Sequence, residues 1–191
     1  MAERDATDAN RYQLPAHERL MVDLGMRAYV AFASPATVLR LFRAEAEQAC
    51  AIAARLDEQQ GRCAARVRRV IGLEPGGRDW SVYMVLDHLV MVNAAITALV
   101  HALCVTHGQR IEIGHADVTP HVDAGPDRID ALRASVERHA EVIERLGPLN
   151  AHAVYPHPWF GPLDARQWHA LAALHNRTHR VQLQRIARRF D

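Results

Sequence analysis

Two histidines four residues apart are the side chains of this chain whose spacing most directly suggests chemistry. They stand as His175-Asn-Arg-Thr-His179. In a helix, residues four apart lie on the same face, one turn from each other. Two imidazoles placed in this way can bind one divalent metal ion, and a third histidine from another helix would complete a site with an open coordination position. His88 is our candidate for the third ligand.

All three histidines fall on faces that the helical period predicts to be buried. At about 100° per residue, His175 and His179 lie near the middle of an apolar stripe. The stripe consists of Trp168, Leu171, Ala172, Val181, Leu183, Ile186 and Phe190. His88 lies about 40° from the centre of the apolar side of an earlier helix, whereas its neighbour Asp87 points toward the rim or the solvent. A polar side chain buried without partners costs a few kcal/mol, and a shared metal ion would satisfy all three.

The other histidines have simpler interpretations. His139 lies on the apolar stripe of a third helix and is a candidate fourth ligand or pocket acid/base. The remaining ones are expected on the surface or in loops: His17, His101, His107, His115, His121, His152, His157 and His169. A histidine on an apolar face is also commonly a hydrogen-bonded core residue, so the pair alone is a weak signal. The chain has no H-E-x-x-H, no glycine-rich phosphate loop and no G-x-S-x-G.

Composition narrows the class of protein. The chain has 191 residues, 49% hydrophobic residues and a net charge of +1, which suits one globular domain and gives no field that would attract nucleic acid. We interpret the arginines near the end as a solvated helix face; they are Arg177, Arg180, Arg185, Arg188 and Arg189. The three cysteines include no C-x-x-C, which fits a reducing cytoplasm. The uncharged stretch 88–109 is better explained as a buried bundle helix than as a membrane span.

Helical spacing runs through almost the whole chain, and strand signals are nearly absent. Residues 1–33 form an N-terminal extension with room for a short helix over 15–32, and residues 34–191 form one domain. Four long helices are predicted in it, over about 35–60, 81–106, 126–147 and 165–190. Ser34-Pro35 opens the first, and Asp164 with Gln167 caps the last. Residues 62–73 either extend the first helix or form a short one.

The predicted fold is an all-α four-helix bundle. The connection over 107–125 is much longer than a hairpin between antiparallel helices needs, so it can cross the bundle and give an up-down-down-up order. A second long connection covers 149–163. Both loops could roof a pocket, with Trp159, Phe160 and Trp168 at its mouth or, alternatively, as core and loop anchors.

Two segments resemble those of a known family. The first is Asp79-Trp-Ser-Val-Tyr-Met-Val-Leu-Asp-His88-Leu. The second begins at His157-Pro-Trp-Phe-Gly161-Pro-Leu and ends with Leu174-His175-Asn-Arg-Thr-His179-Arg-Val-Gln182-Leu. Together they resemble the second-helix and final-helix signatures of the DinB-like (DinB/YfiT) metalloenzyme superfamily, and the resemblance covers about 35–190.

The resemblance implies an up-down-down-up bundle, often a homodimer, with one zinc or nickel ion held by His88, His175 and His179. It also implies a small-molecule substrate and, in characterised relatives, transferases and isomerases that use a low-molecular-weight thiol. A metal ion with three imidazole ligands keeps positions for water or a thiolate and makes either a nucleophile near neutral pH. By helical angle, His139 or Gln182 could orient that group.

Two hypotheses follow for the function. The first is a metal-dependent enzyme, either a thiol-dependent S-transferase or isomerase or a metal-assisted hydrolase. The second is a non-catalytic dimeric bundle that binds a metal or a small ligand. An open metal position favours the first, and a fourth protein ligand such as His139 would favour the second. Binding to nucleic acid or insertion into a membrane is not expected.

Overall fold

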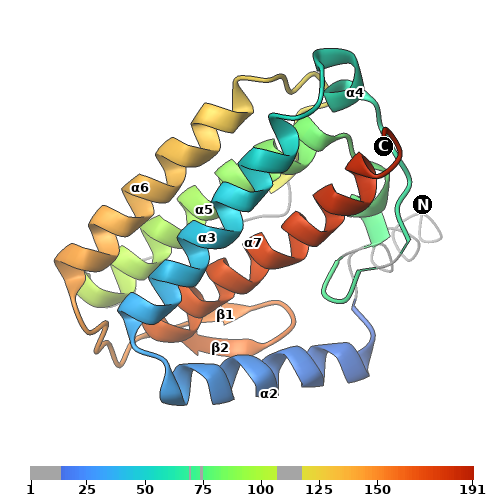
Figure 1. Ribbon diagram of the computed structural model, residues 1–191. Helices are drawn as coiled ribbons and strands as arrows, with labels where there is room; N and C mark the ends of the chain where they lie inside the picture. Colours follow the sequence, from blue (N-terminus) through green and yellow to red (C-terminus); the bar gives the residue numbers. More distant parts are fainter. Residues whose placement is uncertain (1–13, 69, 74, 107–117) are drawn as a thin grey trace, which may run out of the picture.

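The computed structural model describes residues 14–68, 70–73, 75–106 and 118–191, and its helices form a bundle (Figure 1). The four long helices are α3 (Pro35–Ala53), α5 (Val82–Val105), α6 (Arg128–Leu146) and α7 (Ala165–Ala187). The smaller elements are α2 (Ala16–Phe32), α4 (Glu58–Arg62), the 3₁₀ helix η1 (Pro75–Asp79), β1 (Val154–His157) and β2 (Gly161–Asp164). The all-α prediction is therefore confirmed.

Local sequence signals set where the long helices begin. Ser34 accepts a hydrogen bond from the Thr37 amide, and Pro35 occupies the first turn of α3. Ser81 caps α5 in the same way. At α7, the side chain of Asp164 accepts from the backbone of Gln167 while the side chain of Gln167 accepts from that of Asp164, which is the predicted capping box.

Contacts between the helices give their relative directions. Asp87 pairs with Arg128, and Thr97 hydrogen-bonds His139, so α5 and α6 run parallel. A parallel pair requires a crossover, and the predicted long connection supplies it, although residues 107–117 of that connection lie outside the described residues.

The other two long helices run against this pair. Arg43 pairs with Glu144, and the Cys50 thiol lies 3.6 Å from the carbonyl oxygen of Ile129, so α3 is antiparallel to α6. Figure 1 shows α7 beside α3 and running in the same direction. The order is therefore up-down-down-up, as predicted.

The first long helix is shorter than predicted. It ends at Ala53, and a separate helix α4 begins after Asp57, whose side chain caps it. A residue that caps helices well can start a new helix within a segment predicted to be one continuous helix. Its side chain accepts hydrogen bonds from the first amides of the new helix, which otherwise have no partner. Residues 63–68 are neither a continuation nor a short helix: the amides of Ala65 and Val67 bond to the carbonyls of Trp80 and Arg78.

A β-hairpin in the 149–163 connection was not predicted. Strands β1 and β2 pair antiparallel, with Tyr155 opposite Leu163. Gly161 has a φ of 69° at the start of β2, a backbone conformation that glycine adopts without steric cost. The strand signal is weak because the two strands contain two prolines and alternate only partly between apolar and polar residues.

The core lies between the four long helices, and α5 is its most buried element. Leu86, Leu99, Phe42, Leu132 and Leu183 are all nearly inaccessible to solvent. Among the described residues, α5 is a helix whose length and apolar composition would allow it to cross a membrane. Core helices of soluble proteins have the same property. Its packing against both α6 and α7 agrees with the predicted bundle helix.

The N-terminal extension contributes α2, which lies across one end of the bundle and packs against α7 and the hairpin (Figure 1). It has two apolar sides. Met26 on one side is fully buried, whereas Leu20, Leu24 and Phe32 are exposed.

Candidate metal centre

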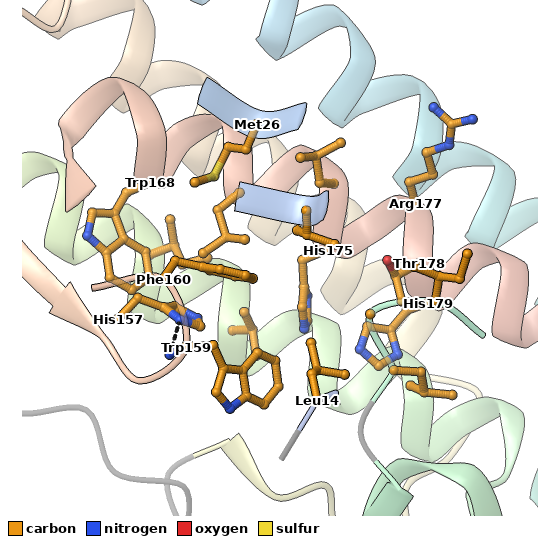
Figure 2. A pocket seen from close by; sticks show the side chains of 18 of the residues that line it. Leu14, Met26, His157, Trp159, Phe160, Trp168, His175, Arg177, Thr178 and His179 are labelled. Carbon is orange, nitrogen blue, oxygen red and sulfur yellow. Dashed lines mark hydrogen bonds between the residues drawn. The ribbon is translucent and has the colours of Figure 1, made fainter. Parts of the chain in front are cut away.

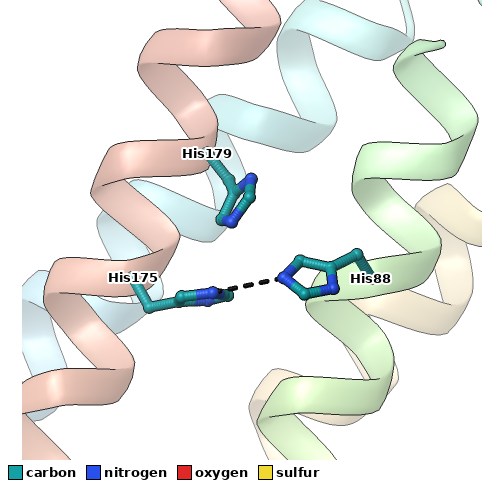
Figure 3. Close-up of side chains that lie close together, drawn as sticks. All are labelled: His88, His175 and His179. Carbon is teal, nitrogen blue, oxygen red and sulfur yellow. Dashed lines mark hydrogen bonds between the residues drawn. The ribbon is translucent and has the colours of Figure 1, made fainter. Parts of the chain in front are cut away.

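Three histidine rings from two helices meet beside the bundle core. His88 comes from α5, and His175 and His179 come from α7 (Figure 3). One nitrogen of each ring lies within 4.8 Å of those of the other two. His88 and His179 are buried and His175 is half-buried. The structure therefore brings together the three predicted ligands, as the helical angles indicated.

Hydrogen bonds on the far side of two rings fix which nitrogen faces the centre. Nδ1 of His88 lies 2.6 Å from the carbonyl oxygen of Val118. Nδ1 of His179 lies 2.8 Å from Oε1 of Gln182. Both partners are acceptors, so each Nδ1 carries the proton and donates it. The lone pair is then on Nε2 of both rings, where a metal ion could bind it.

The spacing of the Nε2 atoms suits a shared cation. Nε2 of His88 and Nε2 of His175 are 3.3 Å apart. Two nitrogens about 2.0–2.1 Å from a tetrahedral metal ion lie about 3.3–3.4 Å from each other. Nδ1 of His175 is buried and has no hydrogen-bond partner among the described residues. No hydrogen bond at Nδ1 therefore fixes the orientation of this ring. The donor set fits a divalent metal ion.

Burial keeps these rings neutral. Loss of solvent lowers the pKa of His88 to about 4. It lowers the pKa of His175 and His179 well below the ordinary value, and repulsion from the neighbouring imidazoles adds to the shift. Neutral imidazole is the form that binds metal ions, so at neutral pH the cluster holds lone pairs rather than charge.

Gln182 and Trp80 support the cluster from outside. Gln182 is fully buried, accepts from His179, and donates from Nε2 to the carbonyl oxygen of Gly77 at 2.7 Å. The prediction was that Gln182 orients a metal-bound group, whereas its amide bonds to the His179 ring and it is not among the residues that line the cavity. Trp80 stacks on His179 with ring centroids 6.1 Å apart and lies 4.9 Å from His88. Sequence reasoning did not select Trp80, although it lies one residue before the cap of α5.

A large cavity adjoins the histidines. Its volume is about 810 Å³, and all three histidines contribute to its wall. Trp159, Phe160 and Trp168 line it, and Figure 2 shows their rings on the hairpin side of the cavity. Phe160 and Trp168 also belong to the hydrophobic core, so the two predicted alternatives, pocket mouth and core anchor, both describe them. The described lining is mostly apolar, and its polar groups beyond the histidines include Arg177, Thr178 and Arg185.

His139 lies apart from this site. It is fully buried between α6 and its neighbours; Nδ1 is 2.7 Å from the Thr97 hydroxyl and Nε2 is 2.9 Å from Nδ1 of His169. Since both ring nitrogens are engaged there and the ring does not line the cavity, the structure does not support His139 as a fourth ligand or as a pocket acid/base.

Two histidines assigned to the surface or loops lie elsewhere. His169 is fully buried and hydrogen-bonds the carbonyl oxygen of Pro35 from Nε2. His157 is half-buried in β1 and lines the cavity against the ring of Phe160. Because His169 follows directly after Trp168, helical angle placed it beside the stripe rather than within it, and the breadth of the buried face was underestimated.

Two charged residues expected in solvent are buried in ion pairs. Asp87 is 2% exposed and binds Arg128 and the backbone amide of His121. Arg180 is 14% exposed at its side chain and pairs with the buried Glu45 of α3. The predictions of a rim position for Asp87 and a solvated face for Arg180 were wrong, because helical period alone does not reveal a charged partner on another helix.

Comparisons with known proteins support the fold and give no information on the chemistry. No protein-family model and no curated protein matches the chain. Among solved structures, the chain is similar to one described as "TT2238, a four-helix bundle protein", with 22% identity and a TM-score of 0.53. The match covers 79% of this chain and 98% of that chain, and it supports the bundle architecture alone.

Proposed function

We propose that this protein is a divalent-metal-dependent enzyme of the DinB-like superfamily, with His88, His175 and His179 as its metal ligands. The observation that carries the proposal is the convergence of three rings whose ligand atoms lie within 4.8 Å of one another. Two of these rings have their protons held on the outer nitrogen. The two sequence signatures quoted above supply the family.

Zinc or nickel suits three neutral imidazoles, and such an ion would lower the pKa of a bound water or thiol enough to make a nucleophile near neutral pH. The chain's own residues prepare the site. The Val118 carbonyl and Gln182 orient two of the ligand rings. The adjoining cavity binds the small-molecule substrate and excludes water from it.

We assign the reaction to thiol-dependent S-transfer or isomerisation, with a low-molecular-weight thiol as the second reactant. An enzyme is favoured over a non-catalytic metal-binding bundle because the cluster opens onto a cavity of about 810 Å³. A closed structural site would have a fourth protein ligand in place of that space. The described histidine, cysteine and carboxylate side chains provide three ligands in this group.

The first test is the metal content of the untagged protein, measured by inductively coupled plasma mass spectrometry. We expect about one zinc or nickel ion per chain and its loss in His88→Ala and His179→Ala. His101→Ala is the matched control, because His101 is an exposed histidine on the same helix as His88. A wild type that neither contains metal nor takes it up from zinc or nickel solutions would refute the proposal.

A further inference from the structure

The cavity beside the histidines is closed on one side by α2. Its wall includes residues of α2, namely Met21, Val22, Met26 and Tyr29, together with residues of α7. Figure 2 shows Met26 across the cavity from the aromatic rings of the hairpin. The four-helix bundle alone would leave the histidine face open on this side, so the N-terminal extension converts it into a chamber.

Polar contacts outside the cavity hold α2 in position. Near its start, Glu18 is buried and accepts from the Gly72 amide at 3.5 Å. At its end, the guanidinium of Arg166 donates to the carbonyl oxygens of Val30 and Ala33 at 2.9 and 3.0 Å. These bonds to main-chain groups fix both ends of the helix, so the chamber is a built feature.

Gly25 lies in the interior of α2 and faces the chamber. A Cβ atom added there would meet no atom within 4 Å. Glycine in a helix interior costs about 0.5–1 kcal/mol relative to alanine, so it is unfavourable where no neighbour requires it. At Gly25 neither a close neighbour nor a positive φ would prevent a larger residue from occupying the position. Gly25 is exposed and helps to line the cavity, so its missing side chain leaves open space at the edge of the chamber.

Aromatic rings form the end of the chamber at the hairpin. His157 stacks on Phe160 with ring centroids 4.6 Å apart, and Trp159 meets Phe160 edge to face at 6.2 Å. Trp168 lies 5.3 Å from His157. Such surfaces bind flat, apolar rings by offset stacking and edge-to-face contact. The polar groups that could react lie along the chamber, at the three histidines.

We infer that the chamber binds a bulky, predominantly apolar small molecule with an aromatic ring, and that α2 is the element that selects it. The inference rests on the proposed function and names its substrate class. The ring would lie against Trp159 and Phe160, and the reactive polar group would face the histidine cluster. Ligand pockets have volumes of about 300–1,000 Å³, so a cavity of about 810 Å³ lies toward the upper end of that range and can hold a bulky molecule.

The test uses N-phenyl-1-naphthylamine, an uncharged aromatic probe whose fluorescence rises on transfer from water to an apolar site. We expect one probe to bind per chain. Gly25→Phe fills the chamber and should weaken binding at least tenfold, with Gly25→Ala intermediate. Leu24→Phe is the matched control, because it adds a similar ring to the exposed side of α2, and it should bind as the wild type does.

Metal content measured on the same samples separates this inference from the proposed function. Gly25→Phe should keep its metal, while His88→Ala should lose the metal and keep probe binding within about threefold. Equal binding by wild type and Gly25→Phe, or equal weakening by Gly25→Phe and Leu24→Phe, would overturn the chamber as the binding site even if the metal is present. Thermal unfolding followed by circular dichroism checks that each variant is folded.

Discussion

Gln182 offers the sharpest test of how the metal centre is held. Its amide makes two hydrogen bonds inside the protein: Oε1 accepts from His179 at 2.8 Å, and Nε2 donates to the Gly77 carbonyl at 2.7 Å. Replacement by leucine removes both bonds while keeping the volume apolar and similar. Replacement by glutamate keeps the acceptor for His179 and removes the donor to Gly77.

The structure sets the expected size of each effect. Loss of a group that orients a ligand histidine costs about 10–100-fold in metal affinity, which is about 1.4–2.7 kcal/mol. We expect Gln182→Leu to show this loss, because the His179 ring can then turn or move its proton. Gln182→Glu should bind metal as well as the wild type. Both variants leave the buried Gly77 carbonyl without its donor, so each should lose about 1–3 kcal/mol of stability.

The assay is competition for zinc with a chromogenic chelator, which gives the affinity of each variant. Urea denaturation in excess chelator gives the stability of the metal-free forms, so that folding and metal binding are measured separately. Wild-type zinc affinity in Gln182→Leu would refute the reasoning, because it would show that the bond to His179 does not position the ligand. Equal loss of affinity in the leucine and glutamate variants would refute the role of the Oε1 acceptor.

Three further predictions concern stability. Burial lowers the pKa of His139 to about 3 and of His169 to about 4, from an ordinary 6.5, so the stability each neutral ring contributes is present above about pH 6.5 and lost below it. Each ring should lower the unfolding free energy by about 2 kcal/mol at about pH 5, relative to its value above about pH 6.5. Urea denaturation measures this change, and a gain in stability toward acid would contradict it. Arg180→Met should destabilise the fold by less than the roughly 3–5 kcal/mol of a fully unpaired buried charge, because Glu45 keeps Arg177 at 4.0 Å, and Glu45→Met with Arg180→Met should recover most of the loss. Gly25→Ala should raise the unfolding free energy by about 0.5–1 kcal/mol, and a decrease would show that the site is not open.

The convergence of His88, His175 and His179 could be predicted because all three lie on helices. The period of a helix turns a spacing of four residues into a common face, and caps such as Ser81 and Asp164 fix where counting starts. His175 and His179 could therefore be placed against His88 without knowledge of the loops. The same arithmetic misplaced Asp87, since it gives the direction of a side chain but not the presence of a cation such as Arg128 on a neighbouring helix.

The groups that hold the ligands were harder to find. Two of them are main-chain carbonyls, from Val118 and Gly77, and any residue type carries a carbonyl. Their positions depend on loop paths, which side-chain periodicity does not predict. Gln182 was selected by its inward helical angle, but for orienting a bound group; its bond to His179, three residues earlier on the same helix, was not predicted.

The N-terminal extension shows why a boundary drawn from helical pattern can separate parts of one site. Residues 1–33 lie outside the four-helix pattern, and we predicted that they precede the domain. Yet α2 lines the cavity that adjoins His175 and His179, and Arg166 of α7 binds its end. The bundle supplies the proposed metal ligands from its long helices, whereas α2 and the hairpin supply walls of the adjoining cavity. On this division, substitutions on α2 should change which molecules bind and leave the metal in place, because no ligand or orienting group comes from α2.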